Sequence, residues 1–339
     1  MQSSERSDEN KVTTSRRNSA NRAARVAIIG TGYVGATTAY ALLLSGTAAQ
    51  IVLIEKDKAL AEGHAQDLRD AELFSHTAQV TAGDFSDCAT ADVIIVTAGV
   101  GHRPGAPRLE YLKENASIIK DILQEISKYR PCGVLLMTSN PVDVLTYAAC
   151  KWSGMDANRI LGSGTTLDTS RLRRRLGEHC GMSPNNVHAY VIGEHGDSQV
   201  PVLASARIAG VALEEFYRAL NVPCDQAALV EIANSARAAA SEIISAKGAT
   251  YYGIAAALVR IVGAILRDEG AVLTVSSLVP DSMGLGSVAL SLPTIVGRDG
   301  IKKILPIALS ESENRALHES AEILKRHIAF LEESTTAVA

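Results

Sequence analysis

The chain has 339 residues, of which 47% are hydrophobic and 21% charged, as expected of a protein that buries a large core, in one domain or two. Its net charge of -4 argues against a broadly basic surface for nucleic acid. Residues 251–266 form the most apolar run, but Arg260 interrupts it and it is too short to cross a bilayer. Five cysteines without a CxxC pair favour reduced thiols, as in the cytoplasm.

Residues 1–24 are rich in Ser, Asn, Arg, Glu and Asp and lack the apolar stretch of a signal peptide. We therefore expect a disordered N-terminal extension, followed by ordered structure from Arg25. Short apolar runs predict buried strands at 26–29, 51–54, 93–96 and 134–137. Helical patterns lie between them, at 32–45 with a glycine stop, at 58–73 and at 111–129. This alternation predicts a doubly wound parallel sheet over residues 25–164.

The pattern changes in the second part of the chain. The expected elements are a basic helix at 171–178, strands at 187–192 and 200–208, Ala-rich helices, a hairpin within 271–296 and a final helix at 311–331. This mixture predicts an α+β domain over residues 165–333, joined to the first domain.

A glycine fingerprint stands directly between the first predicted strand and the first predicted helix. Gly30 permits the tight turn, Gly32 lets the backbone approach a pyrophosphate, and Gly35 allows close packing of helix on strand. Glu55 ends the next strand, where a carboxylate grips the ribose hydroxyls and repels the extra phosphate of NADP. The pattern predicts a Rossmann domain that binds NAD, whereas the alternative is a glycine turn with an unrelated acid.

His195 lies in the segment VIGEHGDS, between two glycines that follow a predicted strand. A histidine held on such a turn can face a cleft and exchange protons, although an isolated histidine is more often structural. Asp168 and Arg171 are three residues apart and share one face if the segment is helical. The carboxylate could fix the imidazole tautomer and the guanidinium could clamp a substrate carboxylate. The alternative is an ion pair on a solvated face.

Residues 99–108 are too rich in Gly and Pro for regular structure and end in Arg108. A mobile loop that carries a cation at its far end suits a lid that closes over a substrate. An ordinary surface crossover is the alternative.

These segments together resemble the lactate/malate dehydrogenase family over residues 25–331. The matching segments are GTGYVG at 30–35, TAG at 97–99, TSNPVD at 138–143, GSGTTLDTSR at 162–171, IGEHGD at 192–197 and KGATYYG at 247–253. The resemblance implies that His195 exchanges the proton, that Asp168 is its partner, and that Arg171 holds the substrate carboxylate. It implies further that Arg108 closes over the substrate and polarises its carbonyl.

The resemblance also implies the remaining residues of the cofactor and substrate sites. Asn140 would lie between cofactor and substrate, and Thr250 would line the substrate side-chain pocket. The implied cofactor residues beyond the three glycines and Glu55 are Val34, Gly99, Val100, Thr138 and Ser163.

The substrate preference depends on a few positions. The segment GSGTTLDT and Thr250 resemble the lactate branch of the family, which implies pyruvate as the 2-oxo acid. His102 departs from the pattern, because this position usually holds Gln in lactate enzymes and Arg in malate enzymes. A malate dehydrogenase or a broader L-2-hydroxyacid dehydrogenase therefore remains the alternative.

Arg173 and His188 match positions at which similar bacterial enzymes bind fructose 1,6-bisphosphate between subunits. The resemblance thus implies an activated homo-oligomer, as a tetramer. The alternative is that Arg173 belongs only to a basic helix and that His188 is a buried strand residue. A dinucleotide-binding sensor without activity would share the glycine fingerprint but would not need His195, Asp168, Arg171 and Arg108. The histidines show no metal-binding spacing.

Overall fold

The computed structural model of the protein describes residues 23–101, 108–221 and 225–336. In the first half of the chain, strands alternate with helices, as the sequence predicts. The elements are β1 (Arg25–Ile29), α2 (Tyr33–Ser45), β2 (Gln50–Ile54), α3 (Lys58–Glu72), β3 (Gln79–Ala82), β4 (Val93–Val96), α4 (Arg108–Ser127), β5 (Val134–Met137), α5 (Val142–Trp152) and β6 (Ile160–Gly162), with short 3-10 helices at Phe85–Thr90 and Ala157–Arg159.

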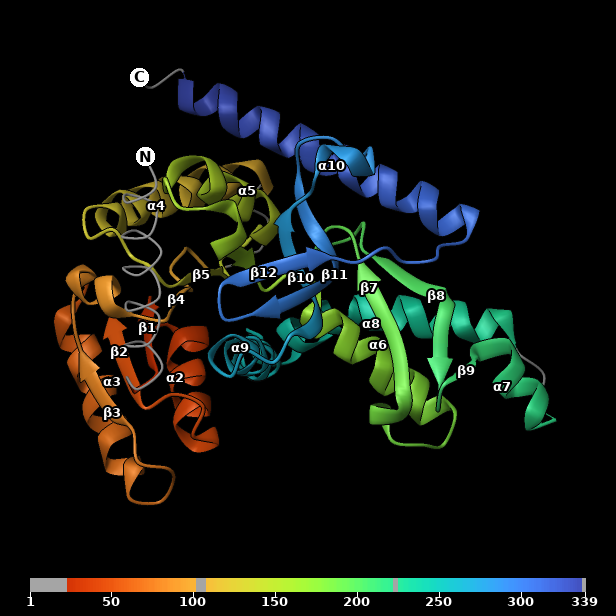
Figure 1. Ribbon diagram of the computed structural model, residues 1–339, viewed down its shortest axis with the longest axis horizontal. Coiled ribbons are helices and arrows are strands. Elements are labelled where there is room, and N and C mark those ends of the chain that lie inside the picture. The colour runs from red at the N-terminus through yellow and green to blue at the C-terminus, as the bar shows by residue number, and fades with distance from the viewer. Residues whose placement is uncertain (1–22, 102–107, 222–224, 337–339) are drawn as a thin grey trace, which may run out of the picture.

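The second half mixes helices with antiparallel strands (Figure 1). Its elements are α6 (Thr166–His179), β7 (Val187–Ile192), β8 (Val200–Ile208), β9 (Val211–Ala212), α7 (Leu213–Ala219), α8 (Gln226–Lys247), α9 (Tyr252–Leu266), β10 (Ala271–Leu278), β11 (Ala289–Gly297), β12 (Gly300–Ile304) and α10 (Glu311–Thr336), with 3-10 helices at Pro184–Asn186 and Asp281–Met283.

Among the described residues, nine strands form one sheet in the order β12-β11-β10-β6-β5-β4-β1-β2-β3. The strands from β1 to β6 pair in parallel, which confirms the predicted doubly wound parallel sheet. β1 and β4 are neighbours and the strand order reverses between them. In sheets of this kind, ligands bind beyond the carboxyl ends of the strands at such a switch point.

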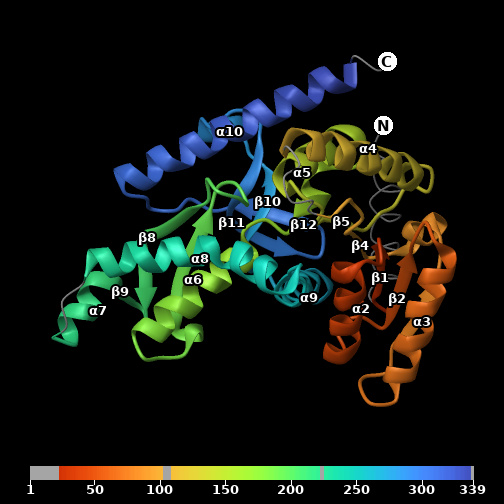
Figure 2. The same cartoon turned by 180° about the vertical axis from the view of Figure 1, so that it is seen from behind.

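The antiparallel strands β10, β11 and β12 continue this sheet instead of forming one of their own. β10 meets β6 where Ser276 pairs with Gly162. A second sheet, β7-β8-β9, lies with α6, α7 and α8 at the other end of the molecule (Figures 1 and 2). The sequence predicts the hairpin of β10 and β11 but not its pairing with the parallel sheet.

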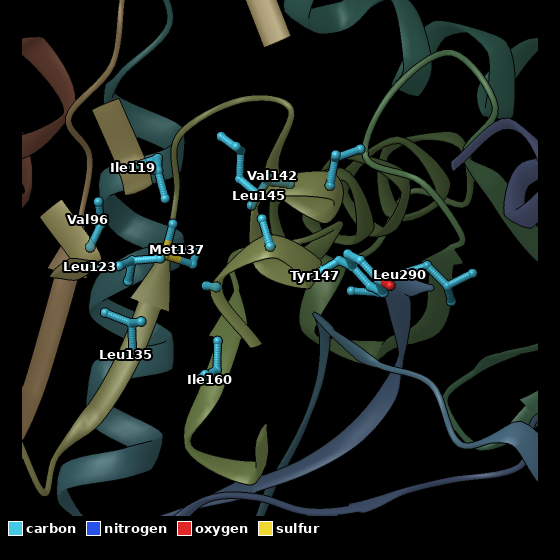
Figure 3. Close-up of a cluster of buried hydrophobic side chains, with 14 of the residues drawn as sticks. Val96, Ile119, Leu123, Leu135, Met137, Val142, Leu145, Tyr147, Ile160 and Leu290 are labelled. Carbon is cyan, nitrogen blue, oxygen red and sulfur yellow. The ribbon is translucent and has the colours of Figure 1, made fainter. Parts of the chain in front are cut away.

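Helices cover both faces of the large sheet because neighbouring strand residues point to opposite sides. In β4, Ile94 and Val96 pack into the core under α4, α5 and α10, part of which Figure 3 shows. Val93 and Ile95 pack into the opposite core, under α2, α3 and α9. A third core joins α6, α7 and α8 to β7 and β8.

Several elements differ from the sequence predictions. Those predictions did not include α5, β6, β9 and β12, and α6 begins at Thr166 and not at residue 171. β3 is missed, because this edge strand buries only one side chain completely, Val80, between polar neighbours. The helices α4 and α10 extend beyond the predicted limits, α4 back to Arg108 and α10 on to Thr336. Within the described parts of the chain, no helix is both long and apolar enough to span a membrane.

Candidate active site

The glycine turn lies between β1 and α2, at the carboxyl end of a central strand. Gly30 has a φ of 94°, and a Cβ there would come within 2.6 Å of the backbone nitrogen of Ala98. A Cβ on Gly35 would lie 1.9 Å from the carbonyl oxygen of Gly30, so only glycine lets α2 pack on the turn. No described atom lies within 4 Å of a Cβ built on Gly32, the N-cap residue of α2. The N-terminus of α2 is thus open to an approaching phosphate.

Glu55 lies at the carboxyl end of β2, beside this turn. Its Oε2 accepts a hydrogen bond from the backbone amide of Thr31 at 2.7 Å, and its Oε1 accepts one from the amide of Lys56 at 2.8 Å. The carboxylate and the glycine turn line one cavity of about 650 Å³. This volume is typical of a small-molecule or cofactor site.

The residues after β4 adjoin the glycine turn, and those after β5 and β6 follow along the same edge of the sheet. Asn115 of α4 ties two of these segments together: its Oδ1 accepts a hydrogen bond from the amide of Val100, and its Nδ2 donates one to the carbonyl of Asn140, both at 2.8 Å. Ser163 continues the parallel ladder through its amide to the Met137 carbonyl. The hydroxyl of Thr138 is buried without a hydrogen-bond partner among the described residues. An orphaned hydroxyl at the same edge of the sheet as the open glycine turn fits a site for a polar cofactor such as NAD.

His195 follows β7 on a turn, and its side chain is 28% exposed. Its Nδ1 lies 2.6 Å from Oδ2 of Asp168, whose other oxygen accepts a bond from Nη1 of Arg171 at 2.9 Å. Asp168 and Arg171 both lie on α6, with side chains only 4% and 9% exposed. The predicted ion pair of α6 therefore exists, but the alternative of a solvated face is wrong. The structure brings together all three residues.

Electrostatics favour the charged form of this histidine. Burial opposes a charge on the imidazole, but the carboxylates of Asp168 and, to a smaller extent, Asp143 together outweigh burial and raise the pKa of His195 to about 9. The pKa of Asp168 is lowered, because the attraction of His195 and Arg171 overcomes the opposing effect of burial. With Nδ1 engaged by Asp168, Nε2 is the nitrogen that remains to exchange a proton with a ligand.

Two further residues hold the His195 turn, and the sequence patterns predict a role for neither. Asp143, in the first turn of α5, accepts a hydrogen bond from the His195 amide at 2.7 Å. Ser320 of α10 accepts one from the Glu194 amide at 2.8 Å, and its hydroxyl lies 3.0 Å from that of Ser198. The sequence feature that could have indicated Asp143 is an acidic residue at the otherwise apolar start of a helix. No sequence feature indicates Ser320.

Thr250 stands just before α9 and is half-buried. The next residue, Tyr251, stacks on Tyr33 of α2 with a ring distance of 5.3 Å. Because Tyr33 adjoins Gly32, this stack holds Thr250 near the glycine turn.

Part of the predicted lid, residues 102–107, lies outside the described residues. Arg108 is the first residue of α4, but its side chain lies outside what the structure describes. His102 lies outside the described residues altogether.

The two residues of the predicted effector site lie on adjoining elements, α6 and β7. Arg173 is half-buried; its Nε donates a hydrogen bond to the carbonyl of Ala189 at 2.9 Å, and its guanidinium lies 5.3 Å from the ring centre of Tyr190. Burial lowers the pKa of Arg173 despite the opposing effect of Tyr190. His188 directly precedes Ala189 and is exposed. The alternative that His188 is a buried strand residue is therefore wrong.

Two family models together match most of the chain, from residue 24 to residue 335. The NAD binding domain of lactate/malate dehydrogenase matches residues 24–162, and the α/β C-terminal domain of the same family matches residues 165–335. The curated relatives include the L-lactate dehydrogenase of Moorella thermoacetica, 49% identical over 91% of this chain and 98% of that protein. Another is that of Thermus aquaticus, 47% identical over 89% of this chain and 97% of that protein.

Solved structures agree with these sequence matches. A lactate dehydrogenase enzyme from a Medee basin deep-sea metagenome library superimposes with a TM-score of 0.87, at 39% identity, over 92% of this chain and 99% of that one. The ligand-bound minor L-lactate dehydrogenase of Enterococcus mundtii gives the same TM-score at 37% identity, over 91% and 98% of the two chains. From its sequence, its fold and the geometry around His195, the chain belongs to the lactate/malate dehydrogenase family.

Proposed function

We propose that the protein is a cytoplasmic, NAD-dependent L-lactate dehydrogenase that interconverts pyruvate and L-lactate. The observation that carries this proposal is the contact of Asp168 with both His195 and Arg171. This arrangement joins a proton donor to a carboxylate-binding cation, the two groups that reduction of a 2-oxo acid requires. A dinucleotide-binding sensor would have no use for it.

The reaction adds a hydride to C2 of pyruvate and a proton to its carbonyl oxygen. NADH, when bound, supplies the hydride and becomes NAD. His195, kept protonated by Asp168, donates the proton through Nε2. In the reverse direction, a neutral His195 accepts the proton from the hydroxyl of L-lactate.

Arg171 binds the carboxylate of the substrate. One of its nitrogens is paired with Asp168, and the rest of the guanidinium has no hydrogen-bond partner among the described residues. A guanidinium can hold a carboxylate with two parallel hydrogen bonds, which fixes the orientation of C2. Arg108 would arrive on the closing lid, polarise the carbonyl and help to exclude water.

Residues 25–164 would bind NAD, and residues 165–333 would supply most of the substrate site. Gly30, Gly32, Val34 and Gly35 form the turn for the pyrophosphate, and Glu55 binds the adenosine ribose. The other cofactor contacts are assigned to Gly99, Val100, Thr138, Asn140 and Ser163. Thr250 would line the pocket for the substrate methyl group.

His102 is the one residue that favours a second candidate, a malate or broader L-2-hydroxyacid dehydrogenase. A protonated imidazole at this position could pair with the second carboxylate of oxaloacetate, whereas a neutral one suits the methyl group of pyruvate. The test measures kcat/KM for NADH oxidation with pyruvate and with oxaloacetate. We expect pyruvate to be preferred, and His102→Gln to raise that preference by about tenfold to 100-fold, because one charged contact contributes about 1.5–3 kcal/mol. A preference for oxaloacetate would instead support the second candidate.

We also propose activation by fructose 1,6-bisphosphate at a subunit interface of a homotetramer. Arg173 and His188 are the candidate phosphate ligands, and the exposure of His188 on the strand beside Arg173 supports this assignment. Cations from two symmetry-related chains would together neutralise the phosphates and favour one quaternary state.

The Arg173→Gln variant tests the effector site. In this variant, fructose 1,6-bisphosphate should lower the KM for pyruvate much less than it does in the parent. The rate without effector should be unchanged. Arg174→Gln is the matched control, since Arg174 is exposed on the same helix and paired with Glu178. An unchanged response of Arg173→Gln would rule out the assignment.

A further inference from the structure

Carboxylates from two different helices hold the His195 turn. Asp168 of α6 contacts the imidazole of His195. Asp143 of α5 contacts the backbone, since its Oδ2 accepts a hydrogen bond from the backbone amide of His195 at 2.7 Å. Both are buried, with 3% and 1% of their surface exposed. Asp168 has a part in the proposed proton transfer, but Asp143 has none.

We propose that Asp143 is a positioning residue for proton transfer: it fixes the His195 turn and, by its negative charge, favours the protonated imidazole. The inference rests on the proposed role of His195 as the proton donor.

The hydrogen bond by itself does not explain a carboxylate at this position. An amide oxygen would accept the His195 N–H equally well without the cost of burying a charge. Burial raises the pKa of Asp143 to about 6, although the hydrogen bond from His195 lowers it in part. Asp143 therefore carries its charge at neutral pH in spite of that cost. This negative charge stabilises the protonated imidazole, because Asp143 adds to Asp168 in raising the pKa of His195.

Charged groups from two helices and from the turn itself surround His195 and Asp143. The charged groups that act on His195 or on Asp143 are Asp168 and Arg171 of α6, Asp143 of α5 and Glu194 of the turn itself. Arg171 opposes protonation of the imidazole, and the two aspartates favour it. Ser276 of β10 interacts with Asp143 through a neutral hydroxyl, and Ser320 of α10 binds the turn through another.

The decisive variant is Asp143→Asn, which keeps the shape and the accepting oxygen but removes the charge. Its new NH₂ group can keep an interaction with the hydroxyl of Ser276, which interacts with Asp143 in the parent protein. Pyruvate reduction needs protonated His195, so kcat/KM falls as the pH rises through the pKa of that group. Without the nearby negative charge this pKa falls, and the midpoint of the alkaline limb should move down by about 1 pH unit.

Ser320→Ala is the matched control. It removes a buried hydrogen bond from the same turn but changes no charge. We expect it to leave the alkaline midpoint in place, whatever it does to kcat or to thermal stability. If both variants shift the midpoint equally, the effect comes from loosening the turn, and the charge of Asp143 plays no part.

A titration of the parent protein tests the inference without any substitution, so it does not depend on whether a variant folds. We expect the imidazole signal of His195, followed by NMR between pH 5 and 10, to show a second, smaller inflection near pH 6. There Asp143 takes up a proton and loses its charge as the pH falls. Absence of that inflection, or an Asp143→Asn midpoint equal to that of the parent, overturns the inference. Failure of the proposed function is seen separately: His195→Asn would then keep the rate and the alkaline limb of the parent.

Discussion

At the scale of single residues, one carboxylate of α6 organises two different tasks. Asp168 uses Oδ2 for the imidazole of His195 and Oδ1 for the guanidinium of Arg171. Both cations are thereby fixed in orientation. Because the three side chains are largely buried, charge-assisted bonds among them are stronger than on the surface.

Replacing Arg171 with lysine tests the carboxylate clamp. An ammonium keeps the charge but cannot form two parallel hydrogen bonds, so we expect kcat/KM for pyruvate to fall about 100-fold, mostly through KM. Steady-state kinetics measure this directly. Arg174→Lys on the exposed side of the same helix should change neither constant, and an equal loss in that variant would point to damage of α6.

At the scale of elements, the glycine turn depends on the close approach of α2 to β1. The approach depends on Gly35, where a side chain would meet the Gly30 carbonyl and the hydroxyl of Thr97 at 2.8 Å. The helix ends at Gly46, whose φ of 62° is the left-handed conformation expected at a helix stop. Both ends of α2 are therefore fixed by glycines, for different physical reasons.

The Gly35→Ala variant should displace α2 from the turn. We expect a loss of about 2 kcal/mol in the free energy of unfolding, as for an overpacked core, and a clear rise in the KM for NADH. Gly63→Ala in α3 is the control, because no described atom lies within 4 Å of its Cβ position. Alanine is the better helix former, so this control should gain up to about 1 kcal/mol. Chemical denaturation and NADH kinetics check both, and a stable Gly35→Ala with an unaltered KM would contradict the packing argument.

At the scale of the whole molecule, one sheet runs through both halves of the chain. β10 enters it beside β6, at the pair of Ser276 with Gly162. The helix α10 then crosses back over the first half, where Glu332 accepts a hydrogen bond from the hydroxyl of Tyr147 at 3.1 Å. Figure 2 shows α10 extending from the β8 end toward α4 and α5. The two halves thus share a core as well as a sheet.

A shared core predicts that both halves unfold together. The single tryptophan, Trp152, lies in α5 and reports on the first half, while far-ultraviolet circular dichroism reports on the helices of both. We expect coincident midpoints by the two probes in thermal unfolding. Two separated transitions would show that the halves unfold independently in spite of their common sheet.

The amino-acid sequence by itself determined the local features of the first half. The runs 26–29 and 93–96 are apolar at every position, as strands covered on both faces must be, and the glycines of 30–35 leave little choice of turn. Glu55 was predicted from its place at the end of the second strand and from its spacing after the glycines. These features depend on neighbours in the chain, so a single sequence is enough to predict them.

Only the tertiary structure decided which distant residues meet. His195 meets Asp168 across 27 residues and Asp143 across 52, and Ser320 reaches Glu194 across 126. The exposure of His188 depends on which face of β7 is covered, and the pairing of β10 with β6 depends on how two halves pack. Helix and strand propensities do not specify such contacts, because they arise from the fit of buried surfaces that the chain brings together only on folding.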